Sequence, residues 1–178
     1  MRIVLVGSAI VLSSLLFILN QKIDSQKSTV TFSISNLFVN TVEGSFRNFE
    51  GEASFDIENP EKSSFKIKIP VSSINTENED RDKHLQAEEY FHSEKFPFVE
   101  FNSTFVNKTA EGIDISGMLK IKGVTKEFTI PFNSEKTKEG YHLTGKLEID
   151  RFDFNVGSEG SFSMGRKVEL GIDFYIKN

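Results

Sequence analysis

Strict alternation of apolar and polar residues dominates the chain after Lys22 and predicts β-strands. The clearest example is residues 168–177, where every second residue from Val168 to Ile176 is apolar. The same alternation occurs at residues 29–35, 53–57, 65–71, 99–105, 113–121, 128–132 and 141–149. These make eight strands, with shorter candidates at Phe46–Phe49 and Phe152–Phe154. Strands with one apolar and one polar face form antiparallel sheets, which bury the apolar face in a barrel or a sandwich.

Residues 76–91 break this alternation. They have no β-branched residue after Thr76 and no Gly or Pro. Thr76 or Asn78 can cap a helix, and the acidic residues that follow suit its first turn. Pro97 prevents the helix from continuing. We therefore expect an all-β, single-domain fold with one short helix at about residues 78–91, lying across the mouth or side of a barrel.

The first 21 residues have the pattern of an export signal. Arg2 precedes an uncharged run from Ile3 to Leu19, and polar residues resume at Asn20. These are the n-region and h-region of a secretory signal, although no small-residue cleavage site follows them. Residues 1–21 are therefore interpreted as a signal peptide or an N-terminal anchor. Residues 22–178 are expected to be periplasmic or secreted, or held at the inner membrane by residues 3–19.

Composition narrows the function further. The chain has 18 Phe, no Trp and 3 Tyr, which suits a dry cavity because Phe carries no polar group. A general preference for Phe in the core explains the same count equally well. The absence of Cys excludes disulfides, thiolate metal sites and a Cys nucleophile. A net charge of −5 without a Lys/Arg cluster argues against nucleic-acid binding and against docking on anionic lipid heads.

Candidate catalytic or metal-binding residues are few. Asp80, His84 and Glu88 have i, i+4 spacing on the expected helix, so a metal pair is conceivable there, but no third ligand is within reach. A solvated helix on which Arg81 pairs with a carboxylate is the simpler interpretation. We therefore expect no catalytic residue, no metal and no cofactor. A hydrolase or isomerase that uses His84 is a lower-ranked alternative.

Several motifs occur in a specific order. They are Thr41-Val42-Glu43-Gly44-Ser45-Phe46, Asn78-Glu79-Asp80-Arg81-Asp82 with His84-Leu85, Phe96-Pro97-Phe98-Val99-Glu100-Phe101, residues 117–125, and Ile149-Asp150-Arg151-Phe152-Asp153-Phe154. In this order the chain, from about residue 24 to its end, resembles the YceI-like family of polyisoprenoid-binding proteins. The resemblance implies that residues 22–178 form an antiparallel eight-stranded lipocalin-like β-barrel whose apolar interior holds an isoprenoid chain. Lys27 and Asn36 stand where the family often has His, and Asn155 where it usually has Gly, so the head-group preference can differ.

The expected ligand site is the apolar face of the strands. Each buried CH₂ group contributes about 0.8 kcal/mol, so a long tail needs no polar anchor. The candidate channel residues are Phe32, Ile34, Phe55, Ile57, Phe65, Ile67, Phe101, Phe105, Leu119, Leu147, Ile149, Leu170, Ile172 and Phe174. Arg151 and Arg166 are candidate head-group contacts, or they pair with Asp150, Asp153 or Glu169.

Together these features predict a non-enzymatic protein that binds or carries a long apolar lipid. The resemblance makes an isoprenoid, such as a quinone or a polyprenyl chain, the expected ligand and partner. No nucleic-acid partner is expected, and contact with a membrane is expected only through an uncleaved N-terminal segment. The sequence is compatible with a homodimer as well as with a monomer. The alternative is a structural or interaction barrel with a filled core, tethered to the membrane.

Overall fold

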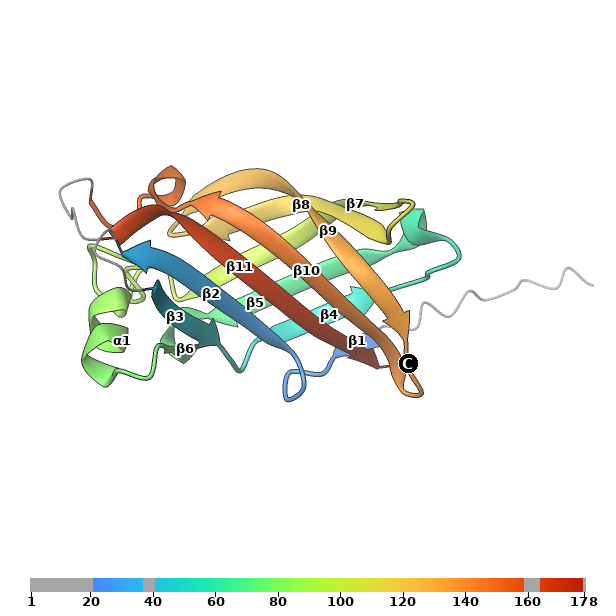
Figure 1. Cartoon of the computed structure of the whole chain (residues 1–178), viewed down its shortest axis with the longest axis horizontal. Coiled ribbons are helices and arrows are strands. Elements are labelled where there is room, and N and C mark those ends of the chain that lie inside the picture. Colours follow the sequence, from blue (N-terminus) through green and yellow to red (C-terminus); the bar gives the residue numbers. More distant parts are fainter. Residues whose placement is uncertain (1–20, 37–40, 159–163, 178) are drawn as a thin grey trace, which may run out of the picture.

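Antiparallel strands close into a barrel in the computed structural model, which describes residues 21–36, 41–158 and 164–177 (Figure 1). Five strands are long and continuous: β7 (Phe98–Lys108), β8 (Ile113–Ile121), β9 (Val124–Lys136), β10 (Gly140–Asp150) and β11 (Met164–Lys177). Each pairs with the next along the chain. The turn between β8 and β9 uses Lys122 and Gly123, both with positive φ, as two-residue hairpins prefer.

Each of the other three places in the eight-stranded ring is occupied by two short strands with a break between them. They consist of β1 (Gln21–Ile23) with β2 (Thr29–Asn36), β3 (Thr41–Phe46) with β4 (Glu50–Ser54), and β5 (Ser64–Pro70) with β6 (Ile74–Asn75). Both β2 and β1 pair along the same edge of β11, while β10 pairs along its other edge. The ring closes because β4 pairs with β1 and β5, and β5 pairs with β7. Across the described residues this confirms the expected eight-stranded antiparallel barrel with one short helix.

The helix α1 (Glu79–Gln86) is shorter than expected. Asn78 caps it, since its side chain accepts a hydrogen bond from the Arg81 backbone N–H at 3.0 Å. The predicted end at residue 91 is wrong: Ala87 is extended, and residues 87–96 form successive turns. These turns direct Tyr90, which is buried, towards the barrel interior, a position that a straight surface helix could not give it.

Three short 3₁₀ helices complete the described part, at Pro60–Lys62, Val71–Ser73 and Arg151–Phe154. The last of them replaces the short strand expected at Phe152–Phe154, which is therefore a wrong prediction. The Asp150 side chain starts this turn by accepting a hydrogen bond from the Phe152 N–H at 2.9 Å, and Asn155 ends it with a φ of 56°. Local side-chain capping thus outweighs the apolar alternation here.

A β-bulge in β7 corrects the predicted direction of Phe105. The register with β8 shifts between Ser103 and Phe105, so the side chains after the bulge change faces. Phe101 therefore points inward, whereas Phe105 is 55 % exposed and Val106 is fully buried in its place. Phe105 is not a channel residue, because strict alternation does not extend through a bulge.

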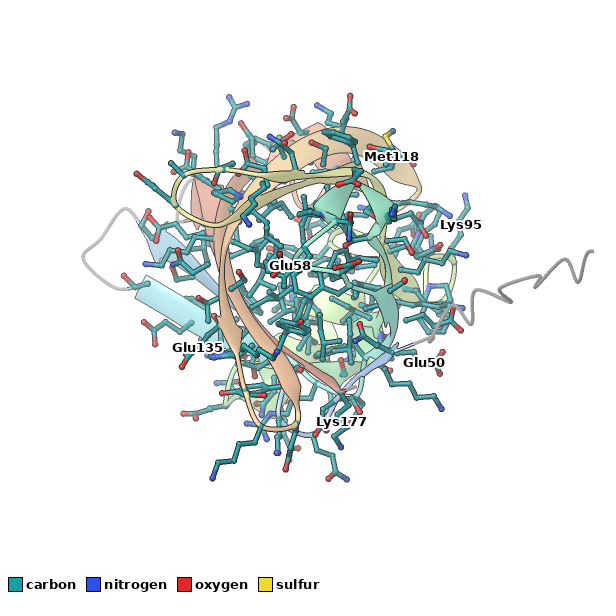
Figure 2. All side chains as sticks on the ribbon, turned by 90° about the vertical axis from the view of Figure 1, so that its right-hand side faces the viewer. Glu50, Glu58, Lys95, Met118, Glu135 and Lys177 are labelled. Carbon is teal, nitrogen blue, oxygen red and sulfur yellow. The ribbon has the colours of Figure 1, made fainter. Side chains whose placement is uncertain are left out.

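One end of the barrel is filled by side chains. Figure 1 shows the start of β1 and the end of β11 at this closed end, with α1 at the opposite end. Figure 2 looks onto the closed end, where Glu58 and Lys177 are labelled. Ile113, Leu143 and Ile176 are each at most 2 % exposed. The ring of Phe55 packs edge-on against Tyr141, with ring centroids 4.9 Å apart. This packing closes the barrel interior on that side.

Asp24 ties β1 to β11 at the closed end. Its carboxylate accepts hydrogen bonds from Lys177 Nζ at 2.9 Å and from the Gln26 N–H at 3.1 Å. The bond from Lys177 is the main reason why the pKa of Asp24 lies below its usual value. A carboxyl whose pKa is lowered by folding stabilises the protein above its unfolded pKa, and this stabilisation is lost as pH falls through the folded pKa.

Acid is therefore expected to lower the urea midpoint of unfolding below about pH 4. Asp24→Asn should lower the midpoint at pH 7 and flatten its dependence on pH in the acid range. Lys177→Met should lower the midpoint at pH 7 as well, because it removes the partner of the same carboxylate. If the urea midpoints of both variants change with pH as much as the wild-type midpoint does, this role for Asp24 is contradicted.

None of the helices in the described ranges is long and apolar enough to cross a membrane. The predicted signal or anchor at residues 3–19 lies outside the described residues.

Candidate functional site

The half of the barrel nearer α1 encloses an apolar channel of about 160 Å³. A single water molecule needs about 10–15 Å³ of such space, so the channel is not a packing defect. All strands except β1 and β4, which lie at the closed end, contribute to its walls. Among the described residues, the surface lining the channel exposes only apolar atoms. The site is therefore a dry channel that ends blindly at the filled end of the barrel.

Most of the predicted channel residues line this space. They are Phe32, Ile34, Phe65, Ile67, Phe101, Leu119, Leu147, Ile149, Leu170, Ile172 and Phe174. Phe55 and Ile57 do not, because the chain after β4 lies at the closed end, where Phe55 is buried against Phe65 and Tyr141. Phe105 lies on the outer face, as the bulge requires.

Sequence reasoning missed the residues at the α1 end of the channel. They are Leu85, Tyr90, Phe91, Val156 and Met164, together with the Phe46 ring, which meets Phe91 edge-on at 6.0 Å. Most of these lie on the helix and loops, where alternation gives no signal. Val30, Ile115, Ile130 and Phe132 also line the channel, and their alternation in the strands could have identified them.

A second hollow beneath α1 adjoins the channel. It shares Phe32, Ile34, Leu85, Tyr90 and Met164 with the channel and adds Val42, Asp80, Arg81 and His84. We infer that this hollow, called the mouth below, is the route between the channel and solvent. Its charged residues come from one face of α1, at the opposite end from the filled part of the barrel.

Arg151 is the one charged residue among the described residues that line the channel. Its side chain is almost entirely buried, and the 3₁₀ turn that it begins directs the guanidinium group towards the loop carbonyls. Nη1 donates to Val156 O at 2.7 Å and Nε to Gly165 O at 2.9 Å, with a longer contact of 3.5 Å from Nη2 to Met164 O. Burial lowers the pKa of Arg151 from its usual value. The guanidinium group thus joins the two ends of the loop between η3 (Arg151–Phe154) and β11.

Arg166 has a different environment. It is mostly exposed and pairs with Asp150, whose Oδ2 lies 2.9 Å from Arg166 Nη2 and 3.0 Å from Nε. It does not line the channel or the mouth. Of the two candidate head-group contacts, only Arg151 lies at the channel wall.

The polar residues of α1 mainly hold the helix in place. Arg81 donates through Nε to Thr76 Oγ1 at 2.8 Å and through Nη2 to Thr76 O at 2.7 Å. Asp82 accepts from the Thr76 backbone N–H at 2.9 Å and from its hydroxyl at 2.6 Å. The His84 ring meets Tyr90 edge-on at 5.0 Å. Over the part of the chain that the structure describes, no three His, Asp or Glu side chains lie close enough to hold a metal ion.

Glycines opposite the channel aromatics keep the channel open. A Cβ atom at Gly44 would lie 2.3 Å from Phe32 Cζ, at Gly117 2.5 Å from Phe101 Cζ, and at Gly145 2.7 Å from Phe132 Cδ1. Each ring therefore occupies the space that a side chain at the glycine would take. The rings lie against the barrel wall and leave the centre of the channel free.

Gly44→Ala is expected to push the Phe32 ring into the channel and to weaken lipid binding by about tenfold. The three atoms nearest to a Cβ at Gly44 belong to the side chains of Phe32 and Thr76, so the closest clashes can be relieved by side-chain movement. Adding Phe32→Leu should restore binding, because the smaller side chain removes the clash. The affinity of each purified variant for a fluorescent polyene lipid measures this, and unchanged binding by Gly44→Ala would refute it.

Comparisons with known proteins agree with this architecture. The model of the YceI-like domain matches residues 21–176. A UPF0312 protein of Photorhabdus laumondii is 33% identical over 147 residues, which cover 76% of each chain. Protein YceI of Salmonella newport is 32% identical over 146 residues, covering 76% of this chain and 74% of the relative.

Solved structures share the fold. Burkholderia cenocepacia BcnA superposes with a TM-score of 0.81 at 22% identity, covering 88% of this chain and 99% of that one. A polyisoprenoid binding domain from Saccharophagus degradans superposes with a TM-score of 0.73 at 13% identity, covering 89% and 98%. At these identities the likeness shows the fold alone. The family model spans nearly the whole barrel and the curated relatives exceed 30% identity, so this chain belongs to the YceI-like domain family.

Proposed function

We propose that the barrel binds a long apolar lipid, an isoprenoid such as a quinone or a polyprenyl chain, and carries it without chemical change. The observation that carries this proposal is the blind channel with an entirely apolar lining among the described residues. At about 0.8 kcal/mol for each buried CH₂, such a wall favours a hydrocarbon tail over any polar ligand. The polyisoprenoid binding domain from Saccharophagus degradans, which has the same fold, supports the choice of an isoprenoid.

The channel also distinguishes this proposal from a filled structural barrel. Packing around Ile113, Leu143 and Ile176 fills the closed end, as a structural barrel would require throughout. The other half leaves space instead, and the glycines beneath Phe32, Phe101 and Phe132 maintain it. We propose the channel-lining residues as the ligand site. Arg151, the candidate contact to a head group, contributes only apolar atoms to the described lining, because its guanidinium group is bonded to backbone carbonyls.

Export belongs to the same proposal. Residues 1–21 have the pattern of a secretory signal or anchor, so a periplasmic or secreted carrier is proposed, with residues 3–19 as the membrane anchor if they are retained. A carrier outside the cytoplasm would move a water-insoluble lipid through an aqueous space.

Native mass spectrometry of the protein, purified from a bacterial periplasm without detergent, tests the proposal. The expected result is one bound lipid for each chain, which organic extraction identifies as an isoprenoid. A protein that is empty as purified and also refuses added ubiquinone and polyprenol would refute lipid carriage and favour the structural barrel.

A further inference from the structure

The channel ends at a layer of side chains, called the floor below. Four cross-strand pairs lie at this level, and in each pair one residue lines the channel and its partner does not. The pairs, with the lining residue first, are Phe65 with Ala53, Phe174 with Leu143, Phe132 with Ile113, and Ile115 with Val106. All four partners are at most 1 % exposed. The change from an open to a filled interior is therefore abrupt.

A second layer of rings backs the floor. Phe55 packs against Phe65, with ring centroids 5.9 Å apart, and against Tyr141 at 4.9 Å. Phe49, which is 2 % exposed, packs against Phe174 at 5.5 Å. Close-packed interiors yield little to an entering group, because each side chain that moves displaces its neighbours. A tail that enters from the mouth therefore stops at the floor.

The channel above the floor is short. On β8 the lining residues run from Ile115 to Ile121, and on β11 below Met164 they run from Val168 to Phe174. Such a stretch covers roughly 20 Å along a strand, or about 15 Å along the axis of a barrel whose strands tilt by about 40°. An extended isoprene unit spans roughly 5 Å, since its carbon–carbon bonds are about 1.5 Å long. About three extended units therefore reach from the mouth to the floor.

The depth of the channel has a consequence for affinity. A tail shorter than the channel leaves part of the apolar wall without contacts, and the excess of a longer tail gains no burial inside the barrel. Resting on the function proposed above, we infer that the floor limits the length of the isoprenoid tail that the protein binds. Leu143 and Ile115 fix its level, Leu143 from behind and Ile115 from the channel side.

A series of prenols tests this inference. Geraniol, farnesol, geranylgeraniol and geranylfarnesol share one hydroxyl head, and each is one isoprene unit longer than the last. Each step as far as geranylgeraniol is expected to tighten binding by at least about tenfold, whereas the step to geranylfarnesol should change it by less than about threefold. Displacement of a fluorescent polyene lipid from the delipidated protein gives the four affinities.

Leu143→Ala lowers the floor. It removes side-chain volume beside Phe174, and an apolar cavity of this kind stays dry and accepts apolar groups. The step from geranylgeraniol to geranylfarnesol should then tighten binding by about tenfold. The matched control is Leu147→Ala, the same substitution on β10 in the side wall, roughly 13 Å nearer to the mouth. It widens the channel without deepening it, so the last step should stay as in the wild type.

Ile115→Phe makes the opposite change and decides the question if Leu143→Ala fails to fold. Ile115 lines the channel beside the fully buried Val106, so the larger ring enters the channel rather than the filled end. The gain in affinity should then end one isoprene unit earlier than in the wild type. Circular dichroism establishes which variants are folded.

Each outcome has a distinct meaning. Affinities that keep rising as steeply through geranylfarnesol in the wild type would overturn the inference and leave lipid carriage intact. A folded Leu143→Ala or Ile115→Phe variant with the wild-type end point, or an equal shift in Leu147→Ala, would overturn the role of the floor. Failure of every prenol, and of added ubiquinone, to bind would refute the proposed function itself.

Discussion

Phe101→Glu is expected to abolish lipid binding while leaving the barrel folded. Phe101 lines the channel, pairs with Ile67 and Leu119 on the neighbouring strands, and lies over Gly117. A carboxylate at this position would have to lose its water when a tail enters, and Arg151, the one charged residue among the described lining residues, is already bonded to backbone carbonyls. That desolvation should lower affinity by at least about 100-fold, or roughly 3 kcal/mol.

Phe105→Glu is the matched control for this prediction. It makes the same substitution four residues along the same strand, but on the outer face beyond the bulge, where Phe105 is 55 % exposed. It should bind lipid like the wild type and be at least as soluble. Titration of both variants with ubiquinone decides the matter. Equal loss in the two variants, or retained binding by a folded Phe101→Glu variant, would contradict the assignment of the channel.

The strands and their inward faces could be predicted from alternation because each inward residue of a barrel strand meets the same dry surroundings. The bulge in β7 was not predictable in this way. Val99, Phe101 and Phe105 are separated by even numbers of residues, so regular alternation places all three on the same face of the strand. Because an extra residue is inserted after Ser103, Val106 is buried and Phe105 is exposed instead. Neighbouring β8 determines this register, and its effect does not show in the composition of β7.

The blind end of the channel was also beyond sequence reasoning. Phe55 and Phe65 each lie in a run of alternating apolar and polar residues, and both are buried. Only Phe65 reaches the channel, because Phe55 packs against Tyr141 in the filled end. Whether an inward residue lines a space or fills one depends on how many large side chains meet from other strands, and alternation along one strand does not report that.

The mouth residues were missed for a different reason. Tyr90 lies on turns, and its burial follows from the early end of α1 rather than from any periodic pattern. Arg151 was identified as a candidate contact, but its partners are the backbone carbonyls of Val156, just after η3, and of Met164 and Gly165 at the start of β11. Such partners carry no side-chain signature, so sequence favoured Asp150, Asp153 or Glu169 as its partner instead. Of these expectations, only the pair between Arg166 and Asp150 is present in the structure.

Arg151→Met is expected to destabilise the protein by about 3 kcal/mol, a large share of the roughly 5–15 kcal/mol by which a typical domain is stable. Met fills similar apolar space but donates no hydrogen bond, so the carbonyls of Val156 and Gly165 lose their common partner. Arg151→Lys should rescue little, because one ammonium group cannot span Val156 O and Gly165 O in the way that a planar guanidinium does. Urea denaturation followed by circular dichroism measures both losses.

Arg166→Met separates this role from a general effect of removing positive charge near Asp150. Arg166 forms a surface ion pair, and such pairs contribute about 0–1 kcal/mol, so this variant should stay close to the wild type in stability. Lipid binding gives a second readout: Arg151→Met should weaken the retention of ubiquinone, because the loop that carries Val156 forms part of the channel wall. Equal stability of the Arg151→Met and Arg166→Met variants would show that the buried guanidinium group does not hold the chain after η3 to the start of β11.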